Sequence, residues 1–171
     1  MPTPISHAAV GYALGAWTRP QRSGWRVVIV AAIGAALPDI DVLGWPLHVS
    51  AASLFSHRAI THSLAFALAA TLAATVLCFR EREWDGSRVR IALLLGLALL
   101  SHSCLDGLTT YSVGIEYLAP FSQQRYRLLW TPLGDPSRGL AAQLIQDFTL
   151  VCLPALVAGW LGMKARGRTP S

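Results

Sequence analysis

The sequence has few charged residues for a chain of its length. Charged side chains make up 13% of the 171 residues, whereas hydrophobic side chains make up 53%. A soluble domain carries about a quarter charged residues, so this chain has too few polar groups to cover the surface of one. The composition therefore excludes an ordinary soluble domain and predicts a chain whose solvent is a lipid bilayer.

Cysteine, a positively charged N-terminus and linkers are also scarce or missing. Cys78, Cys104 and Cys152 lie in or beside apolar runs without a CxxC pair, so we expect them to be small buried side chains. The first arginine, Arg19, follows the first apolar stretch, which predicts a retained segment and not a secretory signal peptide. No linker or repeat divides the chain, so we expect one membrane-embedded domain over 1–163 and a short basic tail over 164–171.

Long hydrophobic runs are missing as well. A spanning helix needs about 20 mainly apolar residues, and most of the runs in this chain are shorter. They are Ala8–Trp17, Val27–Leu37, Leu64–Phe79, Val89–Leu100 and Phe148–Met163. Each becomes long enough only by extending into its polar neighbours. The sequence thus predicts an all-α integral membrane helical bundle of about five transmembrane or partly spanning helices. The alternative for the first two is a re-entrant hairpin.

The positive charge is distributed in short clusters between the apolar runs. This pattern sets membrane topology, and no basic face with interleaved aromatic residues points to nucleic acid as a partner. If five helices alternate across the membrane, ten of the fourteen arginines and lysines fall on one side and four on the other. The side with four carries Arg58, Arg125, Arg127 and Arg138. The positive-inside rule then places the N-terminus outside and the tail in the cytoplasm of a multi-pass inner membrane protein.

Histidines and aspartates gather on the predicted outer side, at the ends of four of these helices. They are His7, Asp39, Asp41, His57, His62, His102 and Asp106. His102 and Asp106 are four residues apart and so share a helix face. Mixed histidine and carboxylate ligands suit zinc or another first-row metal. We therefore predict a site for one or two divalent metal ions, with zinc as the expected metal.

Ordinary roles for single members of this set remain open. A lone interfacial histidine is often only a satisfied polar group, and an aspartate after proline is often a helix cap. Ionisable groups beside hydrocarbon are costly, however, which favours a functional site when seven gather on one side. We expect His57 in the loop entering the third helix, and a turn around Asp39 and Asp41 after Pro38. His48 has no spaced partner and is left out of the site.

Four motifs carry a family resemblance. The order SHAAVGYALG, LPDIDVLG, SHRAITHSL and SHSCLDGLTTY resembles the YdjM-like family of membrane-bound metal-dependent hydrolases, which are LexA-regulated inner-membrane proteins. The resemblance covers about residues 5–135. The ligand pattern is also similar to that of zinc-dependent phospholipase C, in which a helical HxxxD supplies ligands. That similarity implies His102 and Asp106 as ligands, with His62 and either Asp39 or Asp41 upstream. The sequence has no histidine after His102, so the later ligands of those enzymes have no counterpart.

The resemblance implies metal-dependent hydrolysis of phosphoester or lipid-headgroup substrates, with membrane lipids as partners. A bound metal lowers the pKa of water towards ~7, and two metals stabilise both the attacking and the leaving oxygens. Arg58, Asp39 and Asp41 are the expected catalytic residues, with Arg58 binding a phosphate oxygen. A solvated interfacial cation is the alternative for Arg58. A metal-ion or proton-coupled transporter, or a regulatory protein with a structural metal, are the alternatives for the whole chain.

Several further polar residues lie near the predicted site. Candidates for orienting imidazoles or binding substrate, or else for ordinary helix caps and ends, are Thr61, Ser63, Thr109, Thr110, Gln143, Gln146 and Asp147. The outer loop, which contains Tyr117, Tyr126 and Trp130, reads as an interfacial segment that covers the site. Glu116 in that loop is a candidate late ligand.

Overall fold

A computed structural model describes residues 2–20, 24–44, 46–50, 53–110, 114–134, 137 and 139–167. Its helices are α1 (Pro4–Thr18), α2 (Gly24–Ala36), α3 (Leu64–Cys78), α4 (Arg88–Gly107), α5 (Leu140–Asp147) and α6 (Leu153–Gly167). A π-helical segment, Phe148–Cys152, joins α5 to α6 into one continuous rod, and short 3-10 helices cover Leu37–Gly44, Ile60–His62 and Arg82–Trp84. The described residues form isolated bridges but no strand. The prediction of an all-α bundle is confirmed.

Among the described residues, three helical segments are long and apolar enough to cross a membrane. They are Trp25–Gly44, Arg88–Gly107 and Leu140–Arg166. The first combines α2 with the 3-10 turn that carries LPDIDVLG, so this run does reach spanning length through its polar neighbour, as predicted. Helices α1 and α3 have 15 residues each. At 1.5 Å per residue they extend about 22 Å, short of the roughly 30 Å hydrocarbon core, and so are partly spanning.

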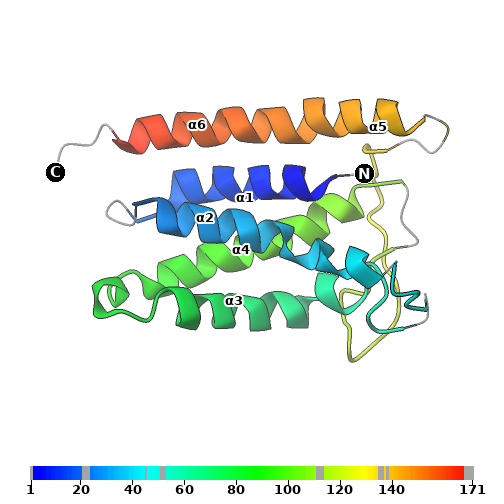
Figure 1. Ribbon diagram of the computed structural model, residues 1–171, viewed down its shortest axis with the longest axis horizontal. Helices are drawn as coiled ribbons and strands as arrows, with labels where there is room; N and C mark the ends of the chain where they lie inside the picture. The colour runs from blue at the N-terminus through cyan, green and yellow to red at the C-terminus, as the bar shows by residue number, and fades with distance from the viewer. Residues whose placement is uncertain are drawn as a thin grey trace.

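The helices lie side by side and alternate in direction along the chain (Figure 1). Helix α1 contacts α2, α4 and α6, and α4 also contacts α2 and α3. The junction of α1 with α2, the α3–α4 connection and the end of α6 lie at one end of the bundle, and the N-terminus and the two long connections lie at the other. The predicted group of ten basic residues and the predicted group of four therefore lie at opposite ends of the bundle, for those members that the structure describes. Arg22, Arg138 and Arg168 lie outside the described residues.

Helices α1 and α2 pack closely because glycines on α1 face α2. A Cβ built on Gly11 would lie 2.7 Å from the Ala35 Cβ and would also clash with the Ala31 carbonyl oxygen. A Cβ on Gly15 would lie 2.9 Å from the Cα of Val28. Small residues at such contacts are typical of helices in membranes, where association depends on close packing of backbones.

Replacing Gly11 with alanine should therefore separate α1 from α2 and destabilise the protein by about 1–3 kcal/mol. Gly34→Ala is the matched control in α2, because its added Cβ would meet its nearest neighbour, Leu99, at an ordinary 3.9 Å. Alanine is also the better helix former. Thermal unfolding in detergent should show a lower midpoint for Gly11→Ala alone. Equal midpoints for the two variants would contradict this packing.

The apolar core lies between α2, α4 and the connection from α3 to α4. It comprises Val27, Ala31, Ala35, Phe79, Trp84, Ile91, Leu94, Leu95 and Ala98. The rings of Phe79 and Trp84 meet edge to face at 5.2 Å, and the Arg26 guanidinium lies over both. Many large apolar side chains of α3 and α6 are exposed, as expected for surfaces that face lipid.

The cysteines depart in part from the prediction. Cys152 is buried as expected, but Cys78 is half-buried and Cys104 is exposed on α4. An exposed Cys104 costs little here because the surface of a membrane helix is itself surrounded by apolar solvent. All three are free thiols.

Candidate metal centre

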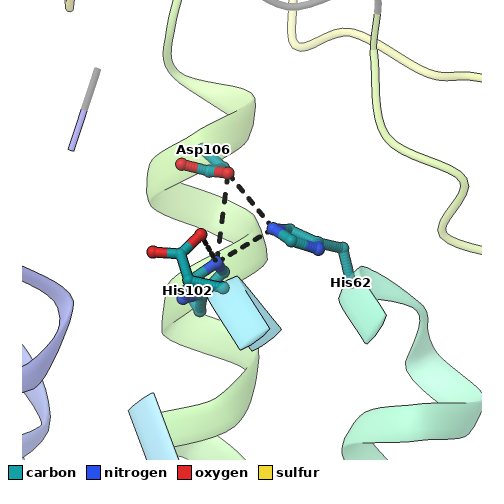
Figure 2. A group of neighbouring side chains, drawn as sticks. His62, His102 and Asp106 are labelled. Atoms are coloured by element: carbon teal, nitrogen blue, oxygen red, sulfur yellow. Dashed lines mark hydrogen bonds and ion pairs between the residues drawn. The ribbon is translucent and has the colours of Figure 1, made fainter. Parts of the chain in front are cut away.

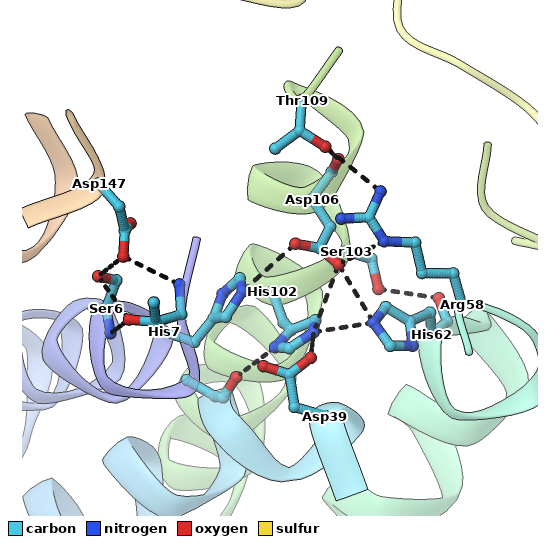
Figure 3. A network of polar contacts seen from close by, with 12 residues as sticks. Ser6, His7, Asp39, Arg58, His62, His102, Ser103, Asp106, Thr109 and Asp147 are labelled. Carbon is cyan, nitrogen blue, oxygen red and sulfur yellow. Dashed lines mark hydrogen bonds and ion pairs between the residues drawn. The ribbon is translucent and has the colours of Figure 1, made fainter. Parts of the chain in front are cut away.

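The seven histidines and aspartates singled out in the sequence lie together where four segments of the chain meet. Figure 3 shows five of them, namely His7, Asp39, His62, His102 and Asp106. Asp41 and His57 contact His62 from beside this group. Helix α1 supplies His7, the 3-10 turn after α2 supplies the two aspartates, the segment before α3 supplies His57 and His62, and α4 supplies the last pair. His7, His62, His102 and Asp106 are at most 1% exposed. Burying ionisable groups costs free energy, which contacts within the cluster must offset.

Four of these residues point ligand atoms at one another. They are Asp39, His62, His102 and Asp106, and their ligand atoms all lie within 4.8 Å of one another. The Nε2 atoms of His62 and His102 are 3.0 Å apart, and Asp106 Oδ2 lies 3.3 Å from the first and 3.9 Å from the second (Figure 2). Asp39 Oδ1 is 3.5 Å from His102 Nε2. Ligands 2.0–2.2 Å from a tetrahedral zinc lie about 3.3–3.6 Å apart, so these spacings fit a metal.

Both imidazoles are oriented by acceptors at their other nitrogen. His102 Nδ1 lies 2.8 Å from the Ala35 carbonyl oxygen, which can only accept, so this nitrogen carries the hydrogen. His62 Nδ1 lies 3.2 Å from Asp41 Oδ2 and 3.0 Å from the Thr61 hydroxyl. In their neutral forms the two rings therefore turn Nε2 lone pairs towards each other. A proton or a metal ion is needed between them, and such outer contacts are typical of metal-bound histidines.

The two aspartates of LPDID have different surroundings. Asp39 faces His102, whereas Asp41 belongs to a second group with His57 and His62. Asp41 Oδ1 lies 2.7 Å from His57 Nδ1, and its Oδ2 accepts from the Arg58 backbone N–H at 3.1 Å and from Thr61 Oγ1 at 2.7 Å. Successive residues of a 3-10 helix are about 120° apart, so residues 39 and 41 point in different directions. Asp41 thus contacts Nδ1 of His62, while Nε2 of the same ring faces the other ligands.

His7 lies beside the four-residue group without belonging to it. Its ring stacks on His102 with centroids 3.7 Å apart, and its Nε2 is 3.4 Å from Asp106 Oδ1. Both ring nitrogens are buried without a hydrogen-bond partner. The adjacent start of α1 is tied to α5, because Asp147 Oδ2 accepts from the Thr3 N–H at 3.0 Å and from Ser6 Oγ at 2.7 Å. Asp147 is the last residue of α5.

Arg58 is buried, which excludes the alternative of a solvated interfacial cation. Its side chain is 4% exposed, and its backbone has a positive φ of 67°. The guanidinium Nε lies 3.1 Å from Asp106 Oδ2, and Nη1 donates to Thr109 Oγ1 at 3.3 Å. The remaining nitrogen, Nη2, is buried without a hydrogen-bond partner. Arg58 therefore combines a fixed ion pair with an unused donor.

The charges of the cluster favour a divalent cation. Asp39, Asp41 and Asp106 are three carboxylates, and the contacts of the cluster include one guanidinium, that of Arg58. With neutral histidines this leaves two uncompensated negative charges in a buried site, which equals the charge that a divalent metal brings. Asp39 Oδ2 is buried without a hydrogen-bond partner, and the two Asp106 oxygens have ion-pair contacts with His7, Arg58 and His62 but no hydrogen bond. The residues present therefore fit a divalent metal of the zinc type.

The other polar residues named from the sequence have mixed roles. Ser63 caps α3 by accepting from the Phe66 N–H at 3.1 Å, and Thr110 and Gln146 bind the 132–134 segment. Ser103, which is not among the residues predicted from the sequence, donates to the His62 carbonyl oxygen at 2.8 Å. Its position directly after His102 was the available signal. His48 is exposed and lies in neither ligand group of the described residues.

The outer loop is anchored beside Arg58. Glu116 is buried, pairs with Arg125 at 2.9 Å, and donates its backbone N–H to the Arg58 carbonyl oxygen at 3.1 Å. Within the described residues Glu116 belongs to neither ligand group, because its carboxylate is taken by Arg125. Trp130 is exposed and Tyr126 partly so, in keeping with an interfacial loop.

Metal retention should depend on pH through His62. Burial alone would lower its pKa, but its contacts with Asp106 and Asp41 raise the pKa above the ordinary 6.5. A proton on Nε2 competes with metal, so metal content should fall as the pH drops through this raised pKa. In the protein without metal, protonation of His62 instead stabilises the fold. This contribution to stability is fully present below the unfolded-state pKa and is lost as the pH rises through the folded-state pKa.

The measurement is metal content after dialysis at pH values from about 8 to about 5. Metal content should fall towards the acid end of this series, because protons compete with the metal for the ligand nitrogens. His48→Ala is the control, because this exposed histidine should leave the profile unchanged. Full retention at about pH 5 would argue against histidine ligands.

Comparison with known proteins agrees with the membrane fold and with the motifs. A family model described as YdjM inner membrane protein matches residues 1–167. The chain is 39% identical over 132 residues to the inner membrane protein YbcI of Escherichia coli (strain K12), which covers 76% of this chain and 74% of that protein. No solved structure matches. The resemblance seen in the sequence is confirmed, and the chain belongs to the YdjM inner membrane protein family.

Proposed function

We propose that this protein is a membrane-bound hydrolase that uses a divalent metal, with zinc as the expected ion, to cleave phosphoesters or lipid headgroups. The observation that carries the proposal is the 3.0 Å approach of two histidine Nε2 atoms beside the carboxylates of Asp39 and Asp106. When bound, such a metal supplies Lewis acidity and activates water at neutral pH. The ordered ligands and the buried surroundings would strengthen electrostatic effects on the substrate.

The residues of the cluster have separate proposed roles. Asp39, His62, His102 and Asp106 hold the metal, and the Ala35 carbonyl and Asp41 keep the two imidazoles in the ligand tautomer. Arg58 Nη2 would bind a phosphate oxygen, while its Nε keeps Asp106 ionised. His57, which pairs with Asp41, is the most accessible histidine of the cluster, with a side chain that is 16% exposed, so substrate would approach from its side.

The test is hydrolysis by purified protein in detergent, stripped of metal and reloaded with zinc or manganese. A panel of soluble phosphomonoesters, phosphodiesters and phospholipids should include a substrate that is cleaved only by the reloaded protein. His62→Ala should lose both metal and activity, because it removes a ligand. His48→Ala is the matched control. If metal-loaded protein cleaves no ester on the panel, the hydrolase proposal is wrong.

A structural metal site is the second candidate, and one observation favours it. Asp39, His62, His102 and Asp106 together could fill all four positions of a tetrahedral ion, and the cluster is almost closed to solvent. Closed four-ligand sites are structural, whereas catalytic sites keep a position open. Cobalt-substituted protein distinguishes the two. A spectrum that changes when inorganic phosphate is added indicates an open position, and an unresponsive tetrahedral spectrum indicates a structural site.

We also propose that the centre faces the non-cytoplasmic side. The support is that ten of the fourteen basic residues are assigned to the opposite end of the alternating helices. Cysteines placed at Ser87 and Ser122, in a background lacking the three native cysteines, should react from opposite sides of the membrane. The cytoplasmic label should reach Ser87→Cys, and the external label should reach Ser122→Cys. Labelling of both from one side would contradict the five-helix topology.

A further inference from the structure

An apolar groove lies next to the candidate metal centre on the outside of the bundle. It has a volume of about 490 Å³, within the range of ligand sites. One wall is the first half of α3, and the other is the loop at 117–121. The side chains that shape it include Leu64, Leu68, Leu72, Tyr117, Leu118 and Phe121.

The groove is built onto the same elements as the ligands. Leu64, at its near end, follows the ligand His62 by two residues and donates its N–H to the Tyr117 carbonyl oxygen at 3.0 Å. The Tyr117 hydroxyl donates to the Ser103 carbonyl oxygen at 3.2 Å. Ser103 in turn donates to the His62 carbonyl oxygen. The near end of the groove is therefore fixed relative to the metal centre.

The far end of the groove runs away from the centre along α3. From Leu64 to Leu72 the helix rises about 12 Å. Leu68 and Phe121 are 63% and 90% exposed, so the groove opens onto the outer surface of the bundle. That surface continues along α3 with exposed Val76 and Leu77. In an inner membrane protein an apolar surface of this kind is in contact with lipid.

We propose that the groove holds an acyl chain of a membrane phospholipid whose phosphate lies at the metal centre. A phospholipid joins a charged phosphate to apolar chains. The Arg58 donor and the metal ligands at one end suit the phosphate, and the uncharged groove at the other end suits an acyl chain. The tail would remain at the level of the hydrocarbon while the phosphoester reaches the centre. The position of the phosphate rests on the proposed function, but occupancy of the groove is measurable without any reaction.

Photo-crosslinking tests occupancy directly. The protein is reconstituted in liposomes of phosphatidylethanolamine and phosphatidylglycerol that contain a trace of phospholipid with a diazirine in the acyl chain. Crosslinks to the groove at 64–72 and 117–121 should exceed those at Leu77, which is also exposed on α3 but lies outside the groove, by about threefold or more. Leu68→Trp, which fills the groove, should remove the excess, whereas Leu77→Trp should keep it. Equal yields at the groove and at Leu77 would overturn the proposal.

Kinetics then separate this inference from the proposed function. Leu68→Trp should lower kcat/KM for a long-chain phospholipid about tenfold and leave a soluble phosphodiester within about twofold. Leu77→Trp should change neither. If Leu68→Trp cleaves both substrates like the parent protein, the groove is not the acyl site although hydrolysis stands. If the parent cleaves neither substrate but crosslinks remain enriched in the groove, lipid binding stands and the proposed hydrolysis fails.

Discussion

Replacing Asp106 with alanine should remove the metal and destabilise the protein by about 3–5 kcal/mol. Its carboxylate is 1% exposed and lies within 3.4 Å of the side chains of His7, Arg58 and His62. The variant would leave the Arg58 guanidinium buried without its counter-ion, which is the costly way to break a buried pair. Loss of a ligand also removes the stabilisation that metal binding adds to the folded state.

Metal content and thermal unfolding in detergent measure these effects together. Asp85→Ala is the matched control, because its carboxylate is 59% exposed and pairs with Arg88 at 2.7 Å. Exposed pairs contribute at most about 1 kcal/mol, so this variant should keep both metal and stability. His102→Ala should resemble Asp106→Ala, since it removes another ligand. Unchanged metal content in both Asp106→Ala and His102→Ala would exclude the proposed site.

Replacing Arg58 with alanine should keep the metal but lower kcat/KM for a phosphoester by about 10²–10³. The reason is that Arg58 Nη2 is a buried donor without a hydrogen-bond partner, whereas Arg58 is not among the four proposed metal ligands. Arg58→Lys should recover only part of the activity, because an ammonium keeps the charge but cannot form the forked contact. The loss of kcat/KM should therefore occur without a loss of bound metal.

The control for this experiment is Arg127→Ala. Arg127 is exposed on the same outer loop that carries Glu116 and Arg125, so its removal changes the net charge equally without touching the cluster. Its kinetics should match those of the parent protein. Arg58→Ala protein that has lost its metal, or that turns over phosphoesters normally, would contradict a substrate-binding role for this arginine.

Much of the fold is predictable from the sequence because hydrocarbon imposes strong rules. The apolar runs, their extension into LPDIDVLG and SHSCLDG, and the alternation of basic clusters follow from the thickness of the bilayer and the distribution of charge. The start of α5 at Leu140 is harder to predict, because this amphipathic turn has no long apolar run. Asp147 consequently lies at the end of α5 and contacts α1, which only the packing of the two helices determines.

The residues of the site are predictable as a set, but their arrangement is not. Spacing places His102 and Asp106 on one helix face, and the structure brings both beside His62. Nothing in LPDID distinguishes Asp39 from Asp41, because the difference depends on the rotation of a 3-10 turn. The acceptor that orients His102 is the backbone carbonyl of Ala35, and no side-chain pattern reveals it. The groove also joins segments about 50 residues apart, 64–72 and 117–121.

X-ray absorption at the zinc edge of the purified, zinc-loaded protein tests the metal centre most directly. We expect a first shell of nitrogen and oxygen at about 2.0–2.2 Å with the outer-shell signature of imidazole, and no sulfur at about 2.3 Å. One imidazole should disappear from the spectrum, or the metal should be lost, in His62→Ala, whereas His48→Ala should leave the spectrum unchanged. A protein that binds no stoichiometric metal, or whose spectrum is the same in His62→Ala, would contradict a metal centre built on His62 and His102.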